Sequence, residues 1–117
     1  MRGDRLRLED ILDAIAVIQR DTPATRQQFD ASPPIKSHIL LHTQIIGEAA
    51  SKLSQALRDQ NPQVPWKPIV RMRNIVAHVY FGIDWDEVWQ VAVRDIAALR
   101  PQIEAILVSL PPDPTGP

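Results

Sequence analysis

The segment from Arg71 to Tyr80 holds the side chains of this chain that are best suited to chemistry. On a helix, where each residue turns by about 100°, Asn74 and His78 lie one turn apart, at the spacing where helical side chains touch. Arg73 and Tyr80 share the border between the polar and the apolar face of the same helix. The pattern therefore predicts a guanidinium, an amide, an imidazole and a phenol within two turns.

These side chains suit phosphoryl transfer without a metal ion. Histidine exchanges a proton near neutral pH, and arginine is a permanent cation whose fork matches phosphate oxygens. His78 would act as general base or acid, and Arg73 would stabilise the charge that develops on the phosphate. The alternative is an ordinary solvated helix face, because Arg, Asn and His are common on protein surfaces.

The spacing Arg73-x-x-x-x-His78-x-Tyr80, with Asn74 directly after the arginine, resembles the signature of HEPN-domain proteins, and specifically of HepT-like toxins. The likeness extends to an ordered set of blocks that covers most of the chain from the second helix onward: Ile46 to Leu53, Val64-Pro65-Trp66, Met72-Arg73-Asn74, His78 to Phe81, and Val88-Trp89.

The resemblance implies a function and partners. HepT-like proteins are all-α, HEPN-type antiparallel bundles of four to five helices that form homodimers, in which the two Arg and His pairs meet in a shared cleft. They cleave RNA without a metal or other cofactor. By analogy the ribose 2′-hydroxyl attacks the adjacent phosphate, His78 transfers the proton, Arg73 holds the phosphate oxygens, and Asn74 supports the geometry. The implied partner is an MntA-type nucleotidyltransferase antitoxin, which neutralises the toxin by AMPylation of Tyr80. The alternative is a non-catalytic module that uses the same cleft to bind a nucleotide or the antitoxin.

Glu48 is a further candidate for the site. A carboxylate among apolar neighbours needs a partner, so Glu48 is expected to orient an arginine of the third helix, with Arg73 as first choice. A surface ion pair with Lys52, one turn further on, is the competing interpretation. Of the other histidines, His42 is expected to be buried and hydrogen-bonded, and the sequence indicates no partner for His38.

Composition limits the function classes. The chain has 117 residues, a net charge of −1 and no cysteine, so disulfides, thiolate nucleophiles and Cys-based metal sites are excluded. The three histidines have no metal-ligand spacing on one helix, and a metal site is not expected. With no stretch of roughly 20 apolar residues to span a membrane, a cytoplasmic protein is expected. Any RNA contact must be local, and Lys67, Arg71 and Arg73 could supply it.

Apolar periodicity predicts four main helices in a single domain over residues 1–110, followed by a disordered, proline-rich tail over residues 111–117. The first helix is expected to start at an Asp4 cap and to end near Arg20. A connection follows, with a short turn near Arg26 and with Phe29 as its anchor. The remaining helices are expected from Pro34 to Gln60, from Trp66 to Tyr80 or Phe81, and from an Asp84 cap to Leu110, with a kink or split near Arg100 caused by Pro101.

The helix expected from Pro34 to Gln60 has two apolar faces. Ile39, Ile46 and Leu53 belong to one stripe, while Leu41 and Ile45 lie on another side. A helix that is apolar on two sides is covered on two sides. In a domain of this size the second covering is expected to be another protomer, which predicts a dimer.

Overall fold

The computed structural model describes residues 2–75 and 82–111, and within these ranges every regular element is helical. This confirms the all-α prediction. The elements in chain order are α1 (Arg2–Asp21), α2 (Arg26–Asp30), α3 (Pro33–Ser51), α4 (Gln55–Gln60), α5 (Trp66–Arg71), the 3₁₀-helix η1 (Met72–Asn74), α6 (Trp85–Gln90), the π-helix η2 (Val91–Asp95) and α7 (Ile96–Ser109).

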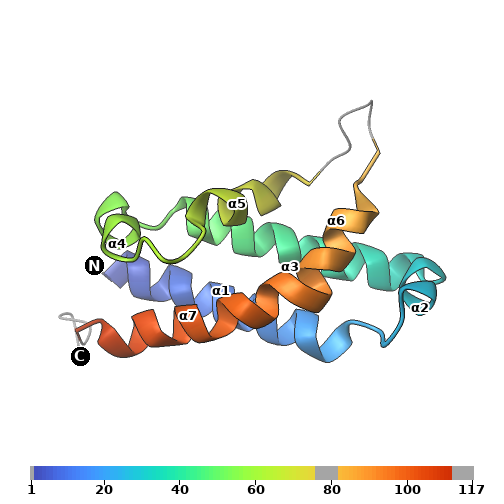
Figure 1. Ribbon diagram of the computed structural model, residues 1–117, viewed down its shortest axis with the longest axis horizontal. Helices are drawn as coiled ribbons and strands as arrows, with labels where there is room; N and C mark the ends of the chain where they lie inside the picture. Colours follow the sequence, from blue (N-terminus) through green and yellow to red (C-terminus); the bar gives the residue numbers. More distant parts are fainter. Residues whose placement is uncertain (1, 76–81, 112–117) are drawn as a thin grey trace.

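The long helices form an elongated bundle of 47 × 29 × 25 Å (Figure 1). Helix α1 packs along both α3 and α7, and the α5–η1 segment packs on α3. Helix α4 lies at the end of the bundle where α1 begins and α7 ends, and α2 lies at the opposite end (Figure 1). Helix α3 is thus the element that connects the η1 segment to the rest of the bundle. None of the helices described is both long enough and apolar enough to cross a membrane.

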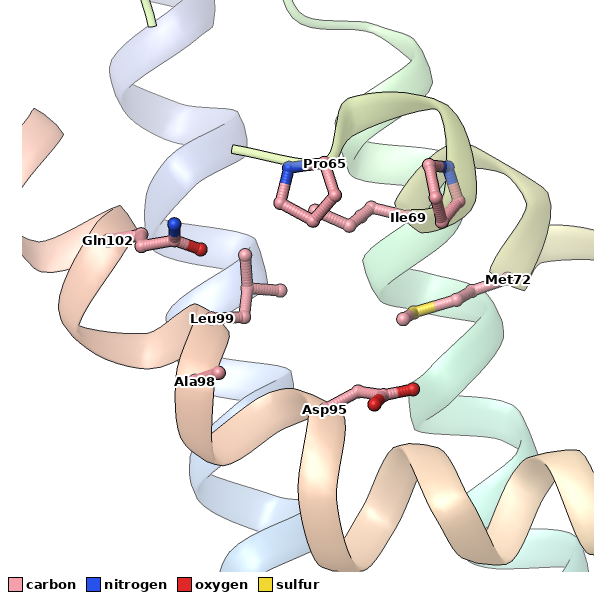
Figure 2. Close-up of a pocket in the computed structure, with 8 residues that line it drawn as sticks. Pro65, Ile69, Met72, Asp95, Ala98, Leu99 and Gln102 are labelled. Atoms are coloured by element: carbon pink, nitrogen blue, oxygen red, sulfur yellow. The ribbon is translucent and has the colours of Figure 1, made fainter. Parts of the chain in front are cut away.

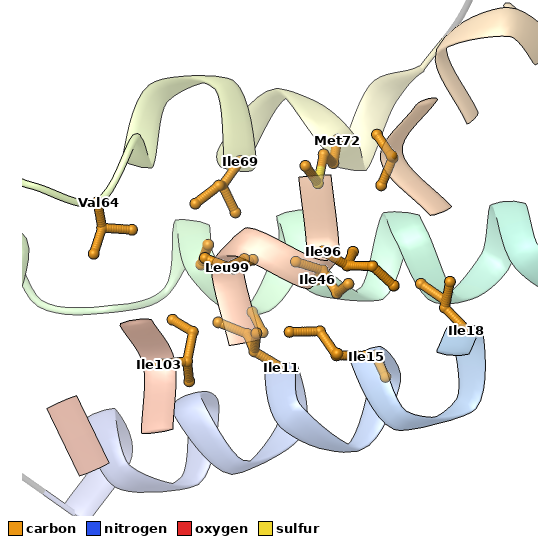
Figure 3. Packing of buried hydrophobic residues seen from close by; sticks show 14 of the residues in the cluster. Ile11, Ile15, Ile18, Ile46, Val64, Ile69, Met72, Ile96, Leu99 and Ile103 are labelled. Carbon is orange, nitrogen blue, oxygen red and sulfur yellow. The ribbon is translucent and has the colours of Figure 1, made fainter. Parts of the chain in front are cut away.

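The apolar stripes predicted from the sequence meet in one core. Leu8, Ile11, Ile15 and Ile18 of α1 are fully buried, and Figure 3 shows α1, α3, α5 and α7 converging on the same cluster. Phe29 is also fully buried and packs against Trp89, with 5.3 Å between ring centroids, which confirms its predicted role as anchor. Burial of a large aliphatic side chain contributes about 1.5–3 kcal/mol, so this cluster dominates the stability of the bundle.

Asp4 was expected to cap α1, and this expectation is wrong. Helix α1 begins at Arg2, and Asp4 lies within it with only 7% of its surface exposed. Its carboxylate accepts hydrogen bonds from the backbone N–H of Ser54 at 2.8 Å and from the Ser54 hydroxyl at 2.6 Å. Asp4 therefore caps the chain between α3 and α4, which is distant from it in sequence.

The continuous helix expected from Pro34 to Gln60 is also wrong. Helix α3 ends at Ser51, and α4 starts at Gln55 with Ser54 as its cap, the hydroxyl accepting from the N–H of Leu57 at 3.2 Å. Because the Ser54 backbone N–H is bound to Asp4, it cannot donate to the carbonyl four residues earlier. A tertiary hydrogen bond therefore ends the helix, and periodicity alone does not reveal it.

The C-terminal segment begins as predicted and then differs. Asp84 caps α6, its carboxylate accepting from the N–H of Glu87 at 3.1 Å. The expected split near Arg100 is absent, because α7 continues through Pro101 to Ser109 with Leu99 and Ile103 buried on either side. The α-helical winding is interrupted instead by the π-helix η2, before α7 begins. The chain changes direction there, between α6 and α7 (Figure 1). Of the expected tail, residues 112–117 lie outside the described residues.

The substitution Asp4→Ala should destabilise the protein by about 2–3 kcal/mol, because it removes two hydrogen bonds to a buried charge and leaves the Ser54 N–H without its acceptor. Urea unfolding followed by circular dichroism measures this loss. Asp13→Ala is the matched control, since Asp13 is exposed on the same helix, and it should be neutral or slightly stabilising. Equal effects of the two substitutions would contradict this account of Asp4.

Candidate functional site

Two of the four signature residues lie in η1, and both are exposed. Arg73 and Asn74 project from the surface of the bundle, while Met72 before them and Ile75 after them are 6% and 2% exposed. The apolar residues on either side hold the short helix against the core. The backbone is thus fixed at a place where a guanidinium and an amide face solvent.

The expected continuous helix from Trp66 to Tyr80 is wrong at Ile75, which has extended backbone angles of φ −84° and ψ 101°. Helix α5 has no side-chain cap at its N-terminus and contains Pro68, which has no N–H to donate. Ile75 is β-branched, which lowers its helix propensity, and its side chain is buried. Asn74 and His78 were expected to lie one turn apart only if that helix were continuous. His78 and Tyr80 themselves lie outside the described residues.

Gly47 of α3 is the residue against which η1 packs. A Cβ built on Gly47 would lie 2.2 Å from the backbone N of Arg73, 2.8 Å from the carbonyl C of Met72 and 2.9 Å from the Cα of Arg73. All three atoms belong to the backbone, so no side-chain rotation could relieve the overlap. The close approach of α3 and η1 therefore requires glycine at this position. A glycine inside a long apolar helix was the sequence signal for this contact.

Glu48 does not orient Arg73 in this structure. It follows Gly47 on α3 and is turned away by about 100° from the side that meets η1. Its side chain is 56% exposed, and its carboxylate lies 4.0 Å from Nζ of Lys52. Among the described residues no hydrogen bond or ion pair joins Glu48 to Arg73, so the structure contains the competing surface ion pair.

His38 and His42 form a separate cluster on α3. His38 Nε2 lies 2.8 Å from Oδ2 of Asp21, and Nδ1 of His42 lies 2.9 Å from the carbonyl O of His38. Arg20, which makes two 2.8 Å hydrogen bonds to Asp21, together with His38 holds the pKa of the Asp21 carboxyl well below its usual range. His42 is hydrogen-bonded as expected, but it is half-buried and not buried. The partner of His38, Asp21, was missed because it lies on another helix. Nowhere in residues 2–75 and 82–111 do three or more His, Asp and Glu side chains gather as metal ligands would.

A cavity of about 230 Å³ lies between the α5–η1 segment and the η2–α7 segment. Figure 2 shows Met72 and Asp95 reaching into it from opposite sides, with apolar walls from Pro65, Ile69 and Leu99. The Asp95 carboxylate already accepts from Nε of Arg94 at 3.0 Å. Arg73 is not among the residues that line this cavity. The cavity therefore lies beside the candidate site and is not part of it.

Comparisons with known proteins agree on one family. The family model described as "Ribonuclease HepT-like" matches residues 11–106, a range that contains all four signature residues. The chain is 33% identical over 100 residues to "Putative RNase MJ1380" of Methanocaldococcus jannaschii, covering 85% of this chain and 92% of that one. It is 32% identical over 108 residues to "Putative RNase TTE0752" of Caldanaerobacter subterraneus subsp. tengcongensis, covering 92% and 96% of the two chains.

A third relative carries a more specific name. The chain is 30% identical over 100 residues to "Probable ribonuclease HepT" of Thermococcus cleftensis, covering 85% of this chain and 91% of the relative. No solved structure matches the chain.

The substitution Gly47→Ala should destabilise the protein by about 1–2 kcal/mol, because the overlap with the Arg73 backbone outweighs the gain in helix propensity. Gly3→Ala is the matched control. Gly3 also lies in a helix, but a Cβ there would meet nothing within 4 Å, so this substitution should be neutral or stabilising. Thermal unfolding of both variants tests the difference in sign. A Gly47→Ala protein that melts at or above the wild-type temperature would refute the contact.

Proposed function

Because the chain belongs to the HepT-like ribonuclease family, we propose that it is a metal-independent endoribonuclease and the toxin of a toxin–antitoxin pair. The observation that carries the proposal is the family match over residues 11–106, which includes Arg73, Asn74, His78 and Tyr80. The exposure of Arg73 and Asn74 on a rigidly packed segment supports it, since both side chains can be reached by a large substrate.

The proposed reaction is attack of a ribose 2′-hydroxyl on the adjacent phosphorus. His78 accepts the proton of the 2′-hydroxyl as the new P–O bond forms, and the bond to the 5′-oxygen of the next nucleotide breaks. The leaving oxygen takes up a proton, and the products are a cyclic phosphate and a 5′-hydroxyl end. Arg73 binds the non-bridging oxygens, where negative charge grows in the transition state. Asn74 supports the geometry beside it.

The second part of the proposal concerns control by a partner. An MntA-type nucleotidyltransferase would transfer AMP from ATP to the Tyr80 hydroxyl and release pyrophosphate. The product carries a negatively charged phosphodiester seven residues from Arg73 along the chain. The added group would fill the site and repel the RNA backbone, which stops cleavage.

We also propose that the protein forms a homodimer. Leu41 and Ile45 of α3 are 52% and 37% exposed, although both are large apolar side chains, which supports a partner on that face. Both lie on the side of α3 that is turned away from Gly47 and η1. A protomer packed there would leave Arg73 and Asn74 open to RNA. Such a dimer would not produce the shared cleft that the family resemblance implied.

The cleavage test uses purified protein, a labelled RNA and excess EDTA. Wild-type protein should cut, whereas Arg73→Ala and His78→Ala should each lose at least about 100-fold in rate, because each removes one part of the acid–base or electrostatic machinery. Glu48→Ala serves as control, since Glu48 faces away from Arg73, and it should cut like wild type. Similar rates in all four proteins would indicate a contaminating nuclease, and binding without cutting would favour the non-catalytic module.

The modification test uses the fact that Tyr80 is the only tyrosine of the chain. Incubation with an MntA-type nucleotidyltransferase and ATP should raise the mass by one or more AMP units and abolish RNA cleavage. Tyr80→Phe should keep its mass and stay active after the same treatment. Intact-mass spectrometry followed by the cleavage assay measures both. AMP found on the Phe variant would place the modification at another residue.

A further inference from the structure

The basic side chains of the described residues fall into two groups. Most are held by a neighbour: Arg7 by Asp10, Arg20 by Asp21, Arg26 by Asp30 and Asp86, Lys52 by Glu48, Arg94 by Asp95, Arg100 by Glu104, Arg5 by the carbonyls of Leu110 and Pro111, and Lys36 by the ring of Trp85. Four further basic side chains have no ion pair with a carboxylate of the described residues and no other neighbour of this kind, and they lie on α4, α5 and η1: Arg58, Lys67, Arg71 and Arg73.

Three of these cations surround one hollow. Arg58 of α4 and Lys67 and Arg71 of α5 line a groove of about 340 Å³, together with Trp66 and Val70. Lys67 and Arg71 are four residues apart and therefore lie on the same face of α5. Figure 1 shows that α5 leads from the α4 end of the bundle toward η1, so the line of cations continues to Arg73.

Arg58 brings an unsatisfied donor to the lining of the groove. Its Nε is buried from solvent and has no hydrogen-bond partner. A buried donor of a charged group without an acceptor is costly, and such groups are normally satisfied in the functional state of a protein. Asp59 also lines the groove, but its carboxylate accepts from Nε2 of Gln55 at 2.8 Å and makes no hydrogen bond or ion pair with Arg58 among the described residues. An anion entering the groove would find two exposed cations and an arginine that lacks an acceptor.

We propose that this basic groove, formed by Arg58, Lys67 and Arg71, binds the phosphodiester backbone of RNA and leads it to Arg73. The inference rests on the proposed function, because it treats Arg73 as the end of the path. Its physical basis is that the protein has a net charge of −1, so attraction for a polyanion cannot come from the molecule as a whole. The attraction must come from a local group of cations, and Arg58, Lys67 and Arg71 form such a group around the groove, with no ion pair to a carboxylate of the described residues.

The test measures RNA affinity as a function of salt in a His78→Ala background, so that the probe, a fluorescent single-stranded oligoribonucleotide, stays intact. Each phosphate contact adds about 0.7 to the slope of log K against log salt for a single strand. The variant Lys67→Gln/Arg71→Gln removes two such contacts, so it should lower that slope by about 1.4 and weaken binding about tenfold or more at low salt. Adding Arg58→Gln should lower the slope further.

The matched control is Arg7→Gln/Arg94→Gln, which removes the same charge from two arginines that already pair with carboxylates. It should leave the slope near the value of the His78→Ala parent. Lys67 and Arg71 are exposed, so their variant should fold normally, and thermal unfolding verifies this.

An unchanged affinity and slope in Lys67→Gln/Arg71→Gln would overturn the proposal, and so would an equal fall in the control. If that variant kept its RNA affinity but lost binding to an acidic protein partner, the groove would belong to that partner. A wild-type protein that binds RNA through the groove without cutting it would refute the proposed nuclease but leave the groove assigned to RNA.

Discussion

The position of the candidate site depends on the absence of one side chain. Gly47 lets the backbone of η1 lie directly on α3, closer than any residue with a Cβ would allow. Helix α3 is in turn packed along α1, whose buried isoleucines form much of the core. Arg73 is therefore attached through its backbone to the most firmly packed part of the protein. A fixed backbone reduces the conformational entropy that an arginine loses when its guanidinium is ordered at a substrate.

The same backbone contact explains why no carboxylate is needed to hold Arg73. An acid beside it would reduce its attraction for a phosphate, and Glu48, the partner expected from the sequence, lies 4.0 Å from Nζ of Lys52 instead. Backbone packing places the guanidinium without neutralising it. The arrangement also extends along α5, where Lys67 and Arg71 are paired with no carboxylate of the described residues.

Much of the fold could be predicted from the sequence, because it depends on periodicity. The stripes of α1, α3 and α7, the Phe29 anchor and the Asp84 cap are local patterns, and the structure contains each of them. Two of the errors share one cause, which is a contact between residues distant in sequence. The end of α3 depends on Asp4 and the end of η1 depends partly on the burial of Ile75, so helix propensity alone places neither boundary.

The candidate site was predicted less completely than the fold, for a related reason. Residue type and spacing were enough to single out Arg73 and Asn74, since exposed polar residues beside a buried stripe can be read from sequence. The direction of Glu48 depended on which side of α3 meets η1, and Gly47 decides that side. Arg58 was missed because the groove that it lines is formed by residues of two separate helices, α4 and α5. Gly47 was thus a more informative signal than Glu48 for the position of the site. A glycine inside an apolar helix marks where another backbone can pass closely, whereas a carboxylate in the same helix only indicates that some partner exists.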